Sequence, residues 1–136
     1  MGFDFGAARI GVAVGDLELR IPHALQVIPS APRTERYRAV GTLVDEWHPV
    51  LIAVGVPFPE DRDPHAFAPR CERFARSLEG RLRLPVVLVD ESFSSHAASD
   101  ALTRVGVRGR GQKPHLDAAA AAEILAVLFS EIDAAA

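Results

Sequence analysis

The opening stretch, residues 1–16, limits the possible folds of this chain more than any other segment. Two apolar runs, at residues 3–5 and 10–14, are separated by a turn of small residues that contains Gly6. This pattern predicts a β-hairpin. Because large apolar residues alternate from the start, we expect the first strand of the hairpin to lie in the centre of a sheet. Asp4 stands inside that strand, where an unpaired buried carboxylate is costly.

Asp4 has two interpretations at this point. A carboxylate in a buried strand typically binds a cation, pairs with a base or titrates abnormally. Alternatively, Asp4 accepts hydrogen bonds from the adjoining turn and has no chemical role. The segment by itself favours neither interpretation.

Chain length and composition predict one soluble domain. A chain of 136 residues can bury one core but not two, so we expect a single domain over residues 1–136 with a frayed tail at 134–136. No stretch approaches the roughly 20 apolar residues of a membrane span, and no leader-like segment precedes the first strand. We therefore expect a cytoplasmic protein with no membrane association. The single cysteine, Cys71, excludes an internal disulfide and has the spacing of a core residue.

The rest of the chain alternates between strand and helix patterns. Pro22 interrupts the third strand and therefore predicts an edge position for it. The expected elements after the hairpin are a strand at 19–28, a helix through 37–47, a strand at 50–57, a helix from Asp63 and Pro64, a strand at 84–89, a short helix near Ser94 and Ser95, a glycine-rich basic loop at 106–114 and a last helix from Asp117. This order predicts an α/β fold, with a mixed five-stranded sheet and helices on both faces.

The first two helices carry apolar stripes at steps of three and four residues, with arginines on what we expect to be solvated faces. The stripes comprise Tyr37, Val40, Val44 and Trp47 in one helix, and Phe67, Cys71, Phe74 and Leu78 in the next. The outward arginines are Arg33, Arg36 and Arg38, and then Arg70, Arg73 and Arg76. The net charge of −3 argues weakly against a general polyanion binder.

Three acidic residues lie where they can converge at one edge of such a sheet. Asp4 is in the first strand, Glu91 follows the last strand, and Asp117 begins the last helix. Converging carboxylates repel one another unless a cation neutralises them, and oxygen ligands favour Mg²⁺ or Mn²⁺. Two such ions can hold a phosphodiester between attacking and leaving oxygens. These residues also have ordinary interpretations. Asp117 can be an N-cap, which contributes about 1 kcal/mol. Glu91 can be a surface residue, with Asp90 beside it better placed for a role in the site.

Four segments, in order along nearly the whole chain, resemble the motifs of one family. They are Gly2-Phe3-Asp4-Phe5-Gly6-Ala7-Ala8-Arg9-Ile10-Gly11-Val12-Ala13, Val54-Gly55-Val56-Pro57, Val89-Asp90-Glu91-Ser92-Phe93-Ser94-Ser95 and His115-Leu116-Asp117-Ala118-Ala119-Ala120-Ala121. The family is that of the YqgF-type nucleases, bacterial relatives of the RuvC Holliday-junction resolvases. Each motif is short, and the ordered set is what identifies the family.

The resemblance implies a ribonuclease H-like fold and metal-dependent cleavage of nucleic acid. It assigns Asp4, Glu91 and Asp117 as the acidic triad that holds a pair of Mg²⁺ or Mn²⁺ ions. Family members are linked to maturation of the 5′ end of 16S ribosomal RNA and, by analogy with RuvC, to resolution of branched DNA. Two-site cleavage of a junction would need a homodimer.

Two departures from the family pattern concern the substrate. The family's Asp-Glu-Arg is Asp90-Glu91-Ser92 in this chain, so an arginine expected beside the site is missing. The loop after Pro57 has Pro59-Glu60-Asp61-Arg62 in place of the usual Asn-x-x-Gly. The first departure bears on substrate orientation and the second on which nucleic acid is admitted.

Cations near these motifs are the expected contacts to nucleic acid. Arg9 lies at the hairpin turn, and a basic loop supplies cations that suit phosphates better than base edges. The predicted contacts are Arg9, Ser94, Ser95, Arg104, Arg108, Arg110 and Lys113. For the loop the alternative is a solvated segment, and for the two serines it is capping of the following helix.

Two other functions compete with a nuclease acting on RNA or branched DNA. One is a non-catalytic nucleic-acid-binding module for ribosome assembly, which the missing arginine at Ser92 favours. The other is a relative of the actin-like ATPases, whose phosphate loop also begins with Asp-x-Gly on a hairpin. Those enzymes need two such domains, and this chain has the length of one.

Overall fold

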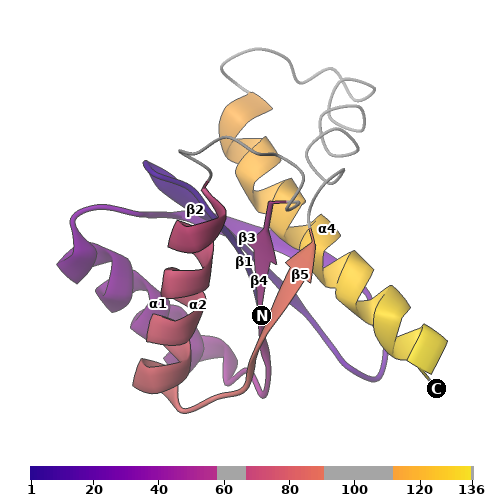
Figure 1. Ribbon diagram of the computed structural model, residues 1–136. Coiled ribbons are helices and arrows are strands. Elements are labelled where there is room, and N and C mark those ends of the chain that lie inside the picture. The colour runs from indigo at the N-terminus through magenta and orange to yellow at the C-terminus, as the bar shows by residue number, and fades with distance from the viewer. Residues whose placement is uncertain (58–66, 91–111, 136) are drawn as a thin grey trace.

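A computed structural model describes residues 1–57, 67–90 and 112–135, and for residues 112–117 the backbone alone (Figure 1). The elements are β1 (Gly2–Phe5), β2 (Arg9–Gly15), β3 (Pro22–Pro29), α1 (Arg33–Trp47), β4 (Ile52–Val56), α2 (Ala68–Leu82), β5 (Val86–Asp90) and α4 (Gln112–Ala135). The predicted α/β class is therefore confirmed.

The five strands form one mixed sheet in the order β3-β2-β1-β4-β5. β1 pairs antiparallel with β2 and parallel with β4, and β4 pairs parallel with β5. The first strand is central, as its alternating large apolar residues predict. β3 lies at an edge, where Pro22, at the start of the strand, can be accommodated.

Helices cover both faces of the sheet, as predicted (Figure 1). On one face α1 and α2 pack over Phe3 and Phe5, and Phe74 contacts both rings at centroid distances of 5.8 and 4.7 Å. On the other face α4 packs over Ala13, Ala53 and Val89. The alternation of side chains along each strand therefore separates two cores.

α4 approaches the sheet closely because β1 begins with a glycine. A Cβ atom added to Gly2 would lie 2.8 Å from Cγ of Leu125 and 3.2 Å from the carbonyl oxygen of Ala121. Gly2 therefore points toward α4, and Phe3 points to the opposite face. This alternation determines which way Asp4 faces.

The structure revises the predicted boundaries of three elements. α2 begins at Ala68, and Pro69 is tolerated in its first turn, where a missing N–H costs no intrahelical bond; the predicted start at Asp63 and Pro64 lies outside the described residues. α4 begins at Gln112, five residues before Asp117 by sequence number, and Pro114 is tolerated in its first turns for the same reason. β3 begins only at Pro22, because Asp16 Oδ1 accepts hydrogen bonds from the backbone N–H groups of Glu18 and Leu19 at 2.6 and 3.2 Å and forms a turn there.

Two predictions about individual side chains have different outcomes. Cys71 is fully buried in the core, as its spacing predicts. Trp47 was expected in the apolar stripe of α1, but 45% of it is exposed, because it is the last residue of the helix and the core ends before it. The short helix expected near Ser94 and the basic loop up to residue 111 lie outside the described residues. Among the described helices, none is long and apolar enough to cross a membrane.

Candidate active site

Asp4 lies near the carboxyl end of the central strand and is half-buried. Its neighbours Phe3 and Phe5 point toward α1 and α2, so strand alternation directs Asp4 toward the face that α4 covers. Carboxyl ends of parallel strands are where open α/β sheets bind ligands. Asp4 is the only acidic residue of β1 and stands at this end.

Glycines flank Asp4 on the two neighbouring strands. Gly11 of β2 is its Cα partner. On the other side, the register pairs Phe3 with Val54, so its continuation places Gly55 of β4 beside Asp4. Neither strand therefore puts a side chain next to the carboxylate at these two positions.

The N-terminal part of α4 runs past the same end of the sheet. Gly2 contacts Ala121 and Leu125, whereas Gly15, farther from the carboxyl end of β1, contacts Phe129. α4 therefore runs opposite to β1. Two strand residues advance about 7 Å, which equals four to five helical residues. By this measure the segment of α4 beside Asp4 includes residue 117.

Asp117 thus belongs to the helical segment nearest Asp4, although the structure describes only its backbone. Figure 1 shows the N-terminal end of α4, in orange, at the end of the sheet toward which the β4 and β5 arrows point. Two of the three predicted acidic residues therefore come from elements that meet at one edge.

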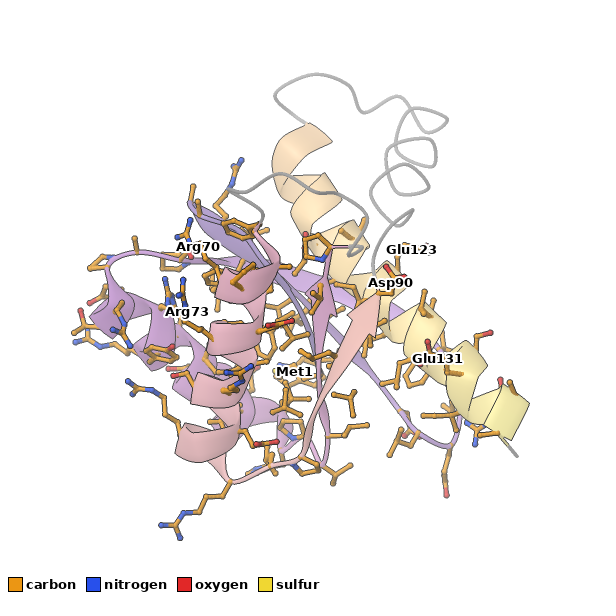
Figure 2. All side chains as sticks on the ribbon, in the orientation of Figure 1. Met1, Arg70, Arg73, Asp90, Glu123 and Glu131 are labelled. Carbon is orange, nitrogen blue, oxygen red and sulfur yellow. The ribbon has the colours of Figure 1, made fainter. Side chains whose placement is uncertain are left out.

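Glu91 lies outside the described residues; in the sequence it directly follows β5, which ends at the same edge. The alternative candidate, Asp90, is the last residue of β5 (Figure 2). Val89 packs with α4, whereas Val86 and Leu88 line a surface with α2. Alternation therefore assigns Asp90 to the α2 face, opposite to that of Asp4.

Arg9 is the first residue of β2 and shares the face of Asp4. Its neighbour Ile10 belongs to the core under α1 and α2, so Arg9 points to the other side. Since Asp4 is paired with Gly11, Arg9 is its diagonal neighbour across the hairpin, and such pairs lie about 7–8 Å apart. Of the other predicted contacts, Lys113 is in the first turn of α4 with only its backbone described, and Ser94, Ser95, Arg104, Arg108 and Arg110 are outside the described residues.

The donor set at this edge suits a hard divalent cation. Asp4 and Asp117 offer only carboxylate oxygens, the ligands that Mg²⁺ and Mn²⁺ prefer. Within the part of the chain whose side chains are described, no three His, Cys, Asp or Glu side chains form a metal-binding group. A complete site at this edge would therefore depend on Glu91 and Asp117.

Sequence reasoning missed a second cluster, at the N-terminal ends of α1 and α2. Four arginines there line a groove of about 230 Å³. We call it the basic groove, and its arginines are Arg33, Arg36, Arg70 and Arg73. These residues were predicted to form plain solvated faces, and for Arg36 that prediction is wrong.

Arg36 is partly buried and held in place. Its Nε donates a hydrogen bond to the carbonyl oxygen of Ser30 at 2.6 Å, and its guanidinium lies 4.9 Å from the ring centroid of Phe5. The sequence did contain a signal for this cluster, because arginines in the first turns of a helix oppose the helix dipole. Such a placement needs a reason beyond helix stability.

A family model described as "RuvX: Holliday junction resolvase" matches residues 1–131. The chain belongs to the RuvX family. The resemblance inferred from the four motifs is thereby confirmed.

Relatives in the RuvX family cover almost the whole chain. A protein of Nitrosomonas eutropha is 43% identical over 135 residues, which are 99% of this chain and 86% of that protein. A protein of Chromobacterium violaceum is 48% identical over 132 residues, 96% of each chain. Both carry the name "Putative pre-16S rRNA nuclease".

The solved structure of T. thermophilus RuvC, in complex with a Holliday junction substrate, has a similar fold. Its TM-score is 0.54 at 18% sequence identity, and the match covers 99% of this chain and 95% of RuvC. This likeness confirms the predicted ribonuclease H-like architecture for this member of the RuvX family.

Proposed function

We propose that this chain is a divalent-metal-dependent nuclease that hydrolyses phosphodiester bonds in RNA, with the 5′ end of precursor 16S ribosomal RNA as its substrate. The observation that carries the proposal is the position of Asp4: half-buried, at the carboxyl end of the central strand, between two glycines and beside the N-terminal part of α4. The names of the relatives from Nitrosomonas eutropha and Chromobacterium violaceum support the choice of RNA.

In this proposal Asp4, Glu91 and Asp117 would hold Mg²⁺ or Mn²⁺. When bound, such ions lower the pKa of an attacking water and offset negative charge on the phosphoryl oxygens. Asp4 supplies its carboxylate from a strand paired on both sides, so its position is fixed before substrate binds. Arg9, on the same face, would contact a non-bridging phosphate oxygen and help to orient the bond.

A second candidate substrate is branched DNA. The description of the family as Holliday junction resolvases and the RuvC fold favour it. Cutting both arms of a symmetric junction needs two active sites, so this activity would require a homodimer. A non-catalytic role in binding nucleic acid is the remaining alternative.

One cleavage assay separates these functions. The substrates are end-labelled RNA that spans the 5′ end of 16S precursor, linear duplex DNA and a four-way DNA junction, each with Mg²⁺, Mn²⁺ or a chelator. We expect cleavage of the RNA with either metal and none with the chelator. Preferred cleavage of the junction would replace the RNA proposal by the DNA one. Binding of RNA without any metal-dependent product would contradict the nuclease proposal altogether.

A further inference from the structure

We propose that the basic groove binds backbone phosphates of the nucleic acid, at positions a few nucleotides from the bond that is cleaved. The identity of the ligand rests on the proposed nuclease function. The groove itself is separate from the acidic edge residues, because it lies on the face of the sheet that α1 and α2 cover.

The first argument is the concentration of positive charge. In the part of the chain that the structure describes, the groove is lined by four arginines together with Phe5, Tyr37, Phe74 and Ser77, and by no acidic residue. Among the described residues, no carboxylate forms an ion pair with any of the four arginines. Glu35 and Glu72, which stand between these arginines in the sequence, pair with arginines outside the groove: Arg38 with Glu35 at 3.1 Å and Arg76 with Glu72 at 3.9 Å.

The helix ends add to this field. Both α1 and α2 start at the groove, and neither has a side chain that caps its N-terminus by a hydrogen bond. The exposed N–H groups of a helix N-terminus carry partial positive charge, so a cation there costs about 0.3–1 kcal/mol. Arg33 and Arg70 in these first turns therefore lower helix stability. They also add positive charge to a site that attracts anions.

Contacts restrict the positions of two of the arginines. Arg36 is fixed by the carbonyl of Ser30, and the guanidinium of Arg70 lies 4.6 Å from the ring centroid of Phe67. Figure 2 shows Arg70 and Arg73 on α2 at the side that faces α1. Arginines ordered in advance lose less rotamer freedom when they bind, and their planar forks match the geometry of phosphate.

The groove is also in the right place for a substrate that extends past Asp4. Phe5, which lines the groove, is the next residue after Asp4 in β1 and points to the opposite face. Consecutive Cα atoms lie about 3.8 Å apart, so the side chains of Asp4 and Phe5 leave the strand close together, on opposite faces. Phosphates recur every few ångströms along a strand, so a chain that crosses this edge reaches both sites within a few nucleotides.

Binding should be tested in the Asp4→Asn background, in which the substrate stays intact. The probe is a short fluorescent single-stranded RNA, and its anisotropy is measured over a range of salt concentrations without added metal. The test variant is Arg33→Gln/Arg73→Gln. The matched control is Arg38→Gln/Arg76→Gln, which removes the same charge from the same two helices outside the groove.

We expect the test variant to bind RNA at least about tenfold more weakly, with a log–log salt slope about 1.4 smaller, because each phosphate contact contributes about 0.7 for a single strand. The control should change the affinity less than about twofold. Equal losses of RNA affinity in the two variants would mean that binding depends on net charge alone, and would overturn the proposal. Unchanged binding in both variants would also overturn it.

Two further outcomes keep the proposals distinct. If polyglutamate competes with the RNA as well as an RNA of equal charge, the groove binds acidic chains in general and the phosphate assignment is wrong. The other outcome is that the unsubstituted chain cleaves none of the substrates, while the groove variant loses RNA binding and the control variant keeps it. In that case the nuclease proposal fails and the groove proposal stands.

Discussion

At the scale of single residues, Asp4 and the groove arginines show what a sequence can and cannot reveal. Asp4 stood out because a carboxylate inside an apolar strand is anomalous. That Gly11 and Gly55 flank it could not be read from the sequence, because it depends on the register of three strands. The position of the arginines off the apolar stripes predicts that they are solvated, yet Arg36 packs against Phe5.

Tyr37, the chain's single tyrosine, lines the basic groove, and the pKa of its hydroxyl depends on the positive charges around it. Burial raises the pKa of the Tyr37 hydroxyl, but polar contacts with Ser77 and Arg36 and the charges of Arg36 and Arg81 outweigh burial and lower the pKa below 10.0. The Arg81 guanidinium lies 3.8 Å from the ring centroid. Arg81→Gln should therefore raise the pKa of Tyr37.

Phenolate absorbance during an alkaline titration follows this one residue. Arg76→Gln, on the same helix, is the control and should leave the pKa of Tyr37 unchanged. A pKa that stays unchanged in Arg81→Gln would show that the charge of Arg81 does not lower the pKa of Tyr37.

At the scale of elements, the hairpin that carries Asp4 depends on its turn. A Cβ atom added to Gly6 would lie 2.6 Å from the carbonyl oxygen of Arg9, which belongs to the backbone and cannot move aside alone. We expect Gly6→Ala to lower the free energy of unfolding by about 1–3 kcal/mol, the usual cost of overpacking. Urea denaturation measures this change.

A second glycine provides the opposite control. Nothing lies within 4 Å of a Cβ atom added to Gly41, inside α1. Gly41→Ala should raise stability by about 0.5–1 kcal/mol, because alanine is the better helix former. If Gly6→Ala is as stable as the parent chain, the tight hairpin described by the structure is wrong.

Elements were predictable where a local pattern had one interpretation. The apolar run of β4 and the proline of β3 gave the right type and place in the sheet. Helix starts were less predictable, because Asp63-Pro64 and Pro69 offer competing N-terminal signals and only packing selects between them. The side chain of Trp47 follows the helical period but lies beyond the end of the core.

At the scale of the whole molecule, the rules of chain connection predicted the topology of the sheet, which local patterns alone could not. The order of strands and helices allows few topologies, and the observed sheet is one of them. The net charge of −3, however, argued against a polyanion partner. The net charge of the whole chain does not reveal the basic groove, because the groove forms only where the N-terminal ends of α1 and α2 meet.

The central claim is that Asp4 takes part directly in phosphodiester hydrolysis, and one comparison tests it most directly. The metal-dependent rate of RNA cleavage is measured for the parent chain, Asp4→Asn and Asp90→Asn, with circular dichroism to verify folding. Asp4→Asn should lower the rate by roughly 10³-fold or more, as expected for a group that acts within a catalytic unit. Asp90→Asn, on the other face of the sheet, should retain most of it. A folded Asp4→Asn variant that cleaves at the parent rate would contradict the account.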